Sequence, residues 1–302
     1  MKEKNRKLFE IYDGYDRFNF PCGLKRATAG TGGEAILIDM YEKTALVDCG
    51  MAYCADKMIE KTKELLNGRN LDYIFISHSH YDHIGALSAV KKAFPEAKVV
   101  ASAKAARVFS SDGAKKVMKE LSDEARLLYS DISEEVVIGD MSVDIIANDG
   151  DSFDLGDAQV EVMETKGHTD CCLTYVLKPL DIMFTSESTG VLQNQYNITS
   201  AILKSYDDCV ESALKCKAKK PSYIIVPHYG FIPQSFNDTY FDEFLAEIED
   251  EKNFVQGWYE KGLSEEEVLE KYKERNWDES REAEQPVEAF LTNARVTIKV
   301  LK

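Results

Sequence analysis

Short apolar runs, separated by turn-forming residues, alternate along the chain with longer segments in which apolar positions recur every three or four residues. The short runs predict β-strands, because most span only about four to six residues and are rich in branched aliphatic side chains. In the first half of the chain the predicted strands are residues 35–40, 44–47, 72–77, 98–101 and 135–146. In the second half they are residues 159–164, 173–177, 182–185 and 223–226.

Segments with helical spacing lie between these strands. The predicted helices are residues 55–66, 84–94 and 206–219, together with a helical stretch that follows residue 101 and ends near residue 128. The first of them stops at Asn67-Gly68, a common signal for the C-terminus of a helix. The strands form antiparallel-looking groups in both halves, with helices interspersed. This pattern predicts an α/β (α+β) fold of two packed sheets with helices outside, rather than a doubly wound parallel sheet.

The last part of the chain is helical. Apolar residues have helical spacing over residues 238–258, and a further helix is predicted over residues 286–300. Between them, Ser264 and Glu267 form a capping box that begins a helix ending near residue 277. We therefore divide the chain into a sandwich domain, residues 1–235, and a C-terminal helical appendage, residues 236–302. The appendage either packs on the sandwich or covers the functional site as a lid.

Composition narrows the range of partners. The net charge is 37 − 53 = −16, which argues against nucleic acid or an anionic membrane as a partner, because both require an excess of Lys and Arg. No apolar run approaches the roughly 20 residues that span a bilayer, and the N-terminal segment lacks the apolar core of a signal peptide. The seven cysteines are an odd number and predict reduced thiols. We expect a cytoplasmic protein that acts on a small molecule. The sequence leaves open whether it forms a homo-oligomer.

All five histidines follow or end predicted strands. Three lie within residues 78–83, and the other two are His168 and His228. Metal binding is a common reason for concentrating imidazoles in this way. Residues two apart in an extended segment point the same way, so His78 and His80 can share one ion. Asp82 and His83 can bind a second ion, because the chain turns into a helix there and their side chains point in another direction.

The remaining histidines complete two sets of ligands. His168 is expected to complete the first set, and His228 to join Asp82 and His83 in the second. Three protein ligands with one open position are typical of a catalytic metal site. Paired ions also share a bridging carboxylate, for which Glu187 is the candidate because it follows a predicted strand. A water between the ions would lose a proton near neutral pH and act as the nucleophile.

These motifs resemble a known family. The residues that carry the resemblance are, in order, Val47-Asp48-Cys49-Gly50, His78-x-His80-x-Asp82-His83, Gly167-His168-Thr169, Glu187 after Phe184-Thr185, and Pro227-His228. Their order and spacing resemble the signature of the metallo-β-lactamase-fold hydrolases over residues 30–230. The resemblance implies an αβ/βα four-layer sandwich with the metals at one edge, between the two sheets. The C-terminal region looks like that of the glyoxalase II type and quinolone-signal-response thioesterases of this superfamily.

One residue departs from the family pattern. The family usually has Asp, within a Gly-Asp pair, where this chain has Ser186-Glu187. Glutamate either bridges both ions or binds one and tilts away. We expect two divalent metal ions, with zinc as the first choice; iron or manganese also suits ligands that include no thiolate.

Several neighbours of the ligands allow two interpretations. Tyr81 and Tyr229 flank ligands, but aromatic side chains at such places more often serve packing. Cys171 and Cys172 follow His168 and are interpreted as buried spectators rather than thiolate ligands. Asp48 and Asp170 are candidates for orienting imidazoles by hydrogen bonds.

The combined prediction is a dinuclear metal-dependent hydrolase that cleaves a small ester, thioester or lactone with a metal-bound hydroxide. Asp82 would orient the nucleophile. The alternative is a di-iron protein of the same fold that binds, reduces or senses oxygen or nitric oxide. His80 disfavours the flavodiiron branch of that alternative, because that branch has Glu at this position.

Overall fold

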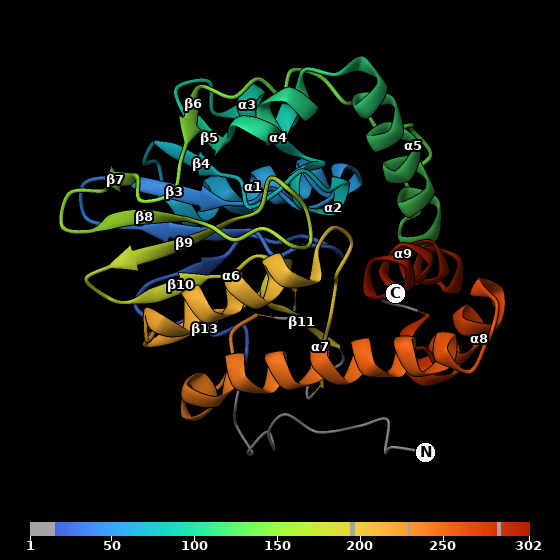
Figure 1. Cartoon of the computed structure of the whole chain (residues 1–302). Coiled ribbons are helices and arrows are strands. Elements are labelled where there is room, and N and C mark those ends of the chain that lie inside the picture. Colours follow the sequence, from blue (N-terminus) through green and yellow to red (C-terminus); the bar gives the residue numbers. More distant parts are fainter. Residues whose placement is uncertain (1–15, 194–196, 229, 283–284) are drawn as a thin grey trace.

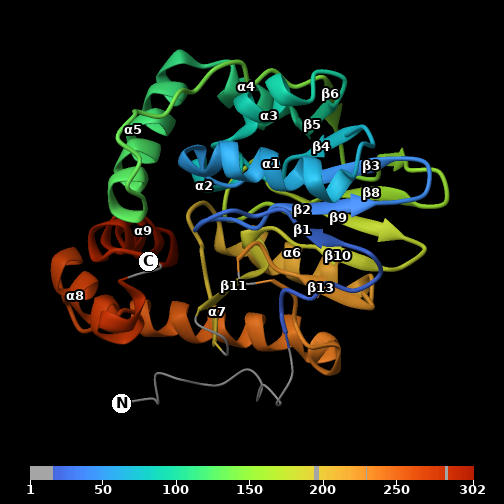
Figure 2. The ribbon, with the colours of Figure 1, turned by 180° about the vertical axis from the view of Figure 1, so that it is seen from behind.

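The structure is a computed structural model that describes residues 16–193, 197–228, 230–282 and 285–302. Two β-sheets pack face to face, and helices cover both outer faces (Figures 1 and 2). In Figure 1 the sheets are seen edge-on, with α3 and α4 above them and α6 and α7 below. This is the four-layer sandwich that the sequence predicts.

The first sheet is mixed. Its strands, in spatial order, are β1 (Lys25–Arg26), β2 (Ile36–Asp39), β3 (Thr44–Val47), β4 (Tyr73–Phe75), β5 (Lys98–Ser102) and β6 (Ile145–Ala147). The first three pair antiparallel, but β3, β4, β5 and β6 run parallel. The expectation of an antiparallel group in this half is confirmed for β1, β2 and β3 and is wrong for β4, β5 and β6. The reason is that helices connect β3, β4, β5 and β6, and such a crossover returns the chain to the edge where the previous strand began.

The helices of this half lie on the outer face of the first sheet, except for α5 (Asp112–Tyr129), which extends beyond the end of the sheet (Figures 1 and 2). They are η1 (Ala52–Cys54), α1 (Ala55–Leu66), α2 (Tyr81–Ile84), α3 (Leu87–Ala93), α4 (Ala103–Phe109) and α5. Their buried side chains, among them Met58, Leu87 and Phe109, share one apolar cluster with Leu46, Ile74 and other outward-facing strand residues.

The second sheet is mainly antiparallel. Its strands, in spatial order, are β13 (Tyr223–Ile225), β10 (Ile182–Phe184), β9 (Leu173–Lys178), β8 (Gln159–Glu164) and β7 (Ser152–Asp154). Only β10 and β13 pair parallel, because α6 (Tyr206–Ala218) lies between them in sequence. The 3-10 helix η2 (Glu187–Thr189) and a separate hairpin of β11 (Val191–Gln193) and β12 (Asn197–Thr199) follow β10. Side chains such as Phe75 and Tyr175, whose ring centroids lie 5.1 Å apart, fill the space between the sheets.

The C-terminal helices extend the outer layer on the second sheet. They are η3 (Gln234–Phe236), α7 (Asn237–Glu260), α8 (Glu265–Asn276), η4 (Glu279–Arg281) and α9 (Val287–Leu301), and the predicted capping box at Ser264 and Glu267 is present. Met183 and Ile224 of the sheet share one apolar cluster with Phe244 of α7. The helices α8 and α9 lie at the same end of the sandwich as α2 (Figures 1 and 2). The domain boundary at residue 235 stays a prediction, because the appendage and the sheet share this core.

Two predicted elements are corrected. Residues 84–94 are not one helix: α2 ends at Ile84 and α3 begins at Leu87, because the backbone there bonds to another segment. The N–H of Cys49 donates to the carbonyl oxygen of His83 at 2.7 Å, and the N–H of Ala86 donates to that of Gly50 at 3.3 Å. Of the strand predicted over residues 135–146, only the end is a strand, β6. The residues before β6 do not form a strand. The backbone N–H of Val136, for example, donates a hydrogen bond to a carboxylate oxygen of Asp123 at 2.9 Å.

The fold brings four strand ends to one edge of the sandwich. Each predicted ligand segment follows the C-terminal end of a strand: residues 78–83 follow β4, His168 follows β8, Glu187 follows β10 and His228 follows β13. The strands β8, β10 and β13 run in the same direction, because β9 is antiparallel to both β8 and β10. In the part of the chain that the structure describes, none of the helices combines the length and the apolar character needed to cross a membrane.

Candidate metal centre

All seven predicted ligands converge at this edge of the sandwich, in two groups. In each group the candidate ligand atoms lie within 4.8 Å of one another. The first group is His78, His80 and His168; the second is Asp82, His83, Glu187 and His228. These are the two sets expected from the sequence, and the loops that carry them come from both sheets.

The first group consists of imidazoles alone. His80 Nδ1 lies 2.9 Å from His168 Nε2. The ring of His78 lies 4.7 Å from that of His80 and 5.0 Å from that of His168, centroid to centroid. Two atoms bound to one zinc ion at about 2.0–2.1 Å in a tetrahedron lie roughly 3.3 Å apart. The spacing of His80 and His168 is therefore close to that of two ligands of one cation.

A backbone carbonyl determines which nitrogen of His168 is free. His168 Nδ1 lies 2.6 Å from the carbonyl oxygen of Ala201. A carbonyl can only accept, so Nδ1 carries the proton and donates it. His168 Nε2 then has an unprotonated lone pair, and this is the atom that faces His80.

Asp48 orients two more imidazoles. His83 Nδ1 donates to its carboxylate at 3.0 Å, and the hydroxyl of Ser77 donates to the same oxygen at 2.6 Å. Because the single hydroxyl proton of Ser77 is used there, its oxygen accepts from His78 Nδ1, which lies 3.0 Å away. In the neutral form, which is the form that binds a metal, both His78 and His83 then have an unprotonated Nε2. The prediction that Asp48 orients an imidazole agrees with these contacts.

Glu187 lies between the two groups. Its Oε1 is 2.9 Å from His83 Nε2 and 3.0 Å from His228 Nε2, in the second group. Its Oε2 is 3.2 Å from His168 Nε2, in the first group. Asp82 completes the second group, with Oδ2 3.4 Å from His83 Nε2 and 3.5 Å from His228 Nε2. Glutamate at this position therefore spans the two groups rather than tilting away from one.

One buried atom tests whether these residues fit metal ions. The imidazole of His78 is fully buried, yet its Nε2 has no hydrogen-bond partner among the described residues. An unsatisfied buried acceptor is unfavourable unless something else contacts it. The Nε2 atoms of His83 and His168 also face nearby nitrogen and oxygen atoms. A cation in each group would satisfy all of these atoms at once, so the residues fit two metal ions.

The two groups differ in their electrostatics. Burial lowers the pKa of His80 to about 4, with a further contribution from His168, and burial also lowers the pKa of His78 well below its ordinary value. These imidazoles are neutral at pH 7, which is the form that binds a metal. Burial alone would lower the pKa of His83 too, but Asp82, Asp48 and Glu187 outweigh it and raise that pKa. The carboxylates make the surroundings of the second group more negative than those of the first, which favours a cation there.

The remaining candidates near the site have other roles. Asp170 does not contact an imidazole in any described hydrogen bond; it lies between Lys104 and Lys204. Cys171 and Cys172 both lie within 3.1 Å of the Thr169 hydroxyl and belong to neither ligand group. Burial raises the pKa of the Cys172 thiol to about 12, which keeps it protonated.

The two tyrosines and the other cysteines complete the comparison with the sequence. Tyr81 packs in a small cluster with Tyr53 and Tyr129, in agreement with a packing role. Tyr229 lies outside the described residues. All seven cysteines are unpaired, as the sequence predicts.

Three contributions to the site were not predicted. Ser77 connects His78 to Asp48 by hydrogen bonds and so orients the His78 ring. Its position directly before the first histidine could have indicated this role. Gly33 lets the chain pass beside His83, since a Cβ there would lie 2.4 Å from the His83 ring. The carbonyl of Ala201 has no signal in the sequence, because every residue has a carbonyl.

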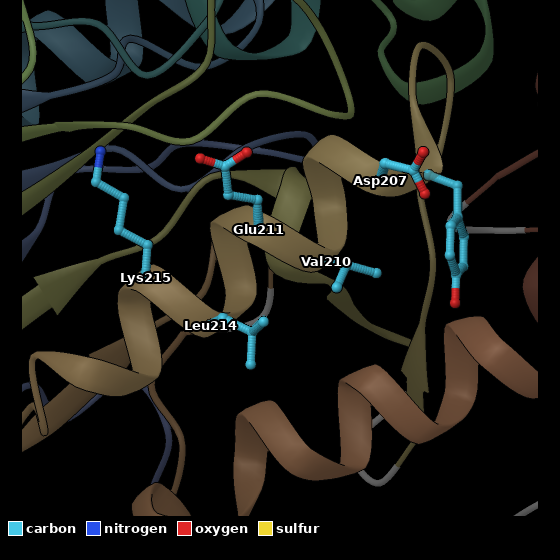
Figure 3. Close-up of a pocket in the computed structure, with 6 residues that line it drawn as sticks. Asp207, Val210, Glu211, Leu214 and Lys215 are labelled. Carbon is cyan, nitrogen blue, oxygen red and sulfur yellow. The ribbon is translucent and has the colours of Figure 1, made fainter.

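A cavity opens beside the first group. Its volume is about 270 Å³, and its lining includes His80, His168, Lys104 and Lys204. A larger groove of about 520 Å³ lies along α6, where Val210 and Leu214 point toward α7 (Figure 3). None of the predicted ligands lines this groove. The smaller cavity is therefore the candidate place for a substrate.

Comparisons with known proteins agree with this geometry. The family model of the metallo-beta-lactamase superfamily matches residues 30–228, which include every predicted ligand. A metallo-beta-lactamase fold-containing protein of Sulfurisphaera tokodaii is 25% identical over 186 residues, which are 59% of this chain and 68% of that protein. The crystal structure of this archaeal protein superimposes with a TM-score of 0.58 at 21% identity, covering 75% of this chain and 86% of that one.

Two further relatives are named for an enzymatic activity. A hydroxyacylglutathione hydrolase of Ruegeria pomeroyi is 26% identical over 150 residues, which are 50% of this chain and 44% of that enzyme. A nitric oxide reductase of Moorella thermoacetica is 36% identical over 76 residues, which are 25% of this chain and 19% of that enzyme. The chain thus matches less than half the length of either enzyme.

Proposed function

The chain belongs to the metallo-beta-lactamase superfamily, and from this we propose that it is a metal-dependent hydrolase of a small ester, thioester or lactone. The observation that carries the proposal is the position of Glu187, whose two carboxylate oxygens face different ligand groups. A substrate-sized cavity opens directly beside these groups. The site therefore has places for two cations and for a small molecule next to them.

The residues divide the work of such a site. His78, His80 and His168 would hold one cation, Asp82, His83 and His228 the other, and Glu187 would contact both. Divalent cations here would polarise a carbonyl oxygen and make water a stronger acid; zinc is our first choice, with iron or manganese as alternatives. Asp82, which is partly exposed, is placed to accept a hydrogen bond from an attacking water and so to orient it. Asp48 and Ser77 keep the imidazoles in the tautomers that leave Nε2 free.

The substrate is proposed to be small. A cavity of about 270 Å³ holds a small molecule and not a folded polymer. The net charge of −16 works against a nucleic-acid or anionic-membrane partner. The similarity to a hydroxyacylglutathione hydrolase supports a thioester among the candidate classes, although the chain matches only 44% of that enzyme.

The test begins with metal loading. The purified protein is stripped with a chelator, reloaded separately with zinc, iron or manganese, and assayed on a panel of short acyl esters, thioesters and lactones. We expect about two metal ions per chain and hydrolysis of at least one substrate class. His80→Ala should lower both metal content and hydrolysis, whereas Lys116→Ala, an exposed change on α5, should alter neither. Hydrolysis that persists in the metal-free protein would contradict the proposal.

A di-iron redox or gas-binding protein is the second candidate. The carboxylate of Glu187 shared between the two groups suits iron, and a nitric oxide reductase is among the relatives. The two candidates are separated by the metal content of the protein as isolated and by its visible absorption spectrum. Iron with visible bands, combined with no hydrolysis of any substrate on the panel, would favour this second candidate.

A further inference from the structure

We propose that Lys104 and Lys204 form a subsite for an anionic group of the substrate, a carboxylate or a phosphate. This inference rests on the proposed hydrolase function and adds to it the charge of the substrate. Both lysines line the cavity beside the first ligand group. They come from different elements: Lys104 from α4, and Lys204 from the loop before α6.

Hydrogen bonds place both lysine-bearing segments against the loop that carries His168. The hydroxyl of Ser102, the N-cap of α4, donates to the carbonyl oxygen of Cys171 at 3.1 Å. The backbone N–H of Lys204 donates to the carbonyl oxygen of Gly167 at 3.0 Å. The two lysines therefore flank residues 167–171 from opposite ends, and their places relative to His168 are set by the backbone.

The lysines share one carboxylate and are free to bind another anion. Asp170 Oδ2 lies 3.5 Å from Lys104 Nζ and 3.6 Å from Lys204 Nζ. Both distances are longer than the roughly 2.7–2.9 Å of a direct charge-assisted hydrogen bond. Two ammonium groups and one carboxylate leave one positive charge, and both lysine side chains are about half exposed. An incoming anion could thus be bound with little disturbance of the pair.

The lining of the cavity indicates the order of groups in the substrate. The lining combines His80 and His168, the charged side chains of Lys104, Lys204 and Asp170, and the apolar side chains of Val108 and Leu203. A substrate that fits has a reactive carbonyl at the imidazoles, a short apolar spacer and an anionic end. On a chain of net charge −16, this local positive charge would offset the general repulsion of an anion.

The first test compares esters of equal length. The metal-loaded protein is assayed on three aryl esters whose acyl chains end in a carboxylate, a methyl ester or an amine. We expect the lowest KM for the carboxylate ester. The double variant Lys104→Ala/Lys204→Ala should raise the KM ratio of the carboxylate ester to the methyl ester roughly tenfold, by loss of charge-assisted hydrogen bonds. Lys116→Ala removes an exposed lysine of α5 and serves as the control, with an unchanged ratio.

A binding experiment separates failure of the subsite from failure of the proposed function. Calorimetry compares glutarate, butyrate and 3-phosphonopropionate: one carboxylate of each can reach the metal centre, and only the dianions have a second group for the lysines. The preferred anion is identified by which of glutarate and 3-phosphonopropionate binds more tightly than butyrate by the larger factor. This advantage in affinity over butyrate should disappear in the double variant. If esters are hydrolysed but neither the KM ratio nor this advantage depends on the lysines, the subsite is wrong and the hydrolase stands. If no ester is hydrolysed but the advantage depends on the lysines, the hydrolase is wrong and the anion site stands.

From a separate set of contacts we infer that Glu251 of α7 is a positioning residue for His168. The carboxylate of Glu251 is buried and accepts hydrogen bonds from the hydroxyls of Ser200 and Tyr272. Ser200 directly precedes Ala201, whose carbonyl oxygen accepts a hydrogen bond from His168 Nδ1 at 2.6 Å. The appendage thus fixes the loop that orients a predicted ligand.

A second contact of the same helix supports this role. The hydroxyl of Tyr240 donates to the carbonyl oxygen of Thr189 at 3.1 Å, and the ring of Phe244 packs so close to Gly190 that a Cβ there would lie 2.7 Å from it. Thr189 is the last residue of η2, which begins at Glu187, and Gly190 is its C-cap. The helix α7 therefore contacts two segments that position predicted ligands. One contact comes from residues near the start of the helix and the other from its middle.

Metal binding tests the role of Glu251. Ser200→Ala and Glu251→Ala should weaken binding to the first group roughly tenfold and change the absorption spectrum of the cobalt-loaded protein. Glu251→Gln should restore part of the affinity, because its amide oxygen still accepts a hydroxyl. Val268→Ala truncates a buried side chain in the same helical core without contacting residues 200–201, and should leave the spectrum unchanged. Equal changes in Val268→Ala and Ser200→Ala, or no change in either, would overturn the inference.

Discussion

Glu187 and Glu251 are both buried glutamates, but their surroundings have opposite effects on them. Glu187 lies in the metal centre among imidazoles of both ligand groups. Burial would raise its pKa, but His168, His228 and His83 outweigh burial and hold the pKa well below its ordinary value. Glu251 lies in the core of the appendage, where burial raises its pKa and the hydroxyls of Ser200 and Tyr272 only partly oppose that rise.

The difference separates a functional carboxylate from a structural one. A carboxylate that stays charged when buried needs positive or hydrogen-bond-donating groups around it. Around Glu187 these groups are imidazoles, which can bind a metal ion in their neutral form. A buried carboxylate whose direct hydrogen-bond partners are hydroxyls is more easily protonated and holds neighbouring segments by its hydrogen bonds. Glu187 is of the first kind and Glu251 of the second, although both are glutamates flanked by polar residues in the sequence.

Replacing the charged carboxylate should have the largest effect. Glu187→Gln keeps the shape but removes the charge that faces both groups, so we expect loss of one metal ion per chain and a fall in hydrolysis on the order of 100-fold or more. Metal analysis and steady-state kinetics on the same preparation measure both. Glu187→Asp is the matched change: the shorter side chain keeps the charge but cannot span the groups equally well. Unchanged metal content and rate in Glu187→Asp would show that spanning both groups is not required.

Removing the shared orienting carboxylate should have the next largest effect. Asp48→Asn can still accept hydrogen bonds, but its amide lacks the charge that holds His83 and Ser77. We expect metal affinity to fall about 10- to 100-fold in both groups, measured by competition with a chromophoric chelator. Glu251→Gln is the comparison, with an effect confined to the first group. An effect of Asp48→Asn on one group alone would contradict its role as the shared partner of two imidazoles.

A steric change should affect one group only. The added Cβ of Gly33→Ala would lie 2.4 Å from two atoms of the His83 ring, so the ring or the backbone must move. Overpacking of this kind typically destabilises a protein by about 1–3 kcal/mol. We expect a lower melting temperature and weaker metal binding in the second group, with the first group unchanged. Gly150→Ala is a poor control because of its positive φ; Gly257→Ala, in α7 with open space at the Cβ, is the matched control.

The buried carboxylate of the appendage should give the smallest effect, visible as a dependence of stability on pH. Its native pKa is raised above the ordinary value of 4.5, so the folded protein binds the proton more tightly than the unfolded chain. The stabilisation is complete below pH 4.5 and is lost as the pH rises through the raised pKa. Glu251→Gln should remove this component. Urea unfolding of both proteins from pH 4.5 upward measures the difference in slope, and parallel curves would contradict the assignment.

Much of the site was predictable because its signals are local. The spacing of His78, His80, Asp82 and His83 places four candidate ligands in one short segment after β4, which runs through a loop into α2. The apolar runs also predicted most strands and helices. The prediction failed over residues 135–146, where apolar residues alternate as in a strand but Asp123, 13 residues away, holds the backbone of Val136.

The sequence by itself determined most element types and the set of seven candidate ligands, because periodicity and motif spacing act over a few residues. Only the tertiary structure decided that Glu187 faces both groups, that Asp48 orients two imidazoles and that the carbonyl of Ala201 selects the tautomer of His168. It also decided that Lys104 and Lys204, 100 residues apart, lie on either side of Asp170. Hydrogen bonds and charge interactions of this kind depend on distances of a few ångströms between segments remote in the chain, and no local pattern records those distances.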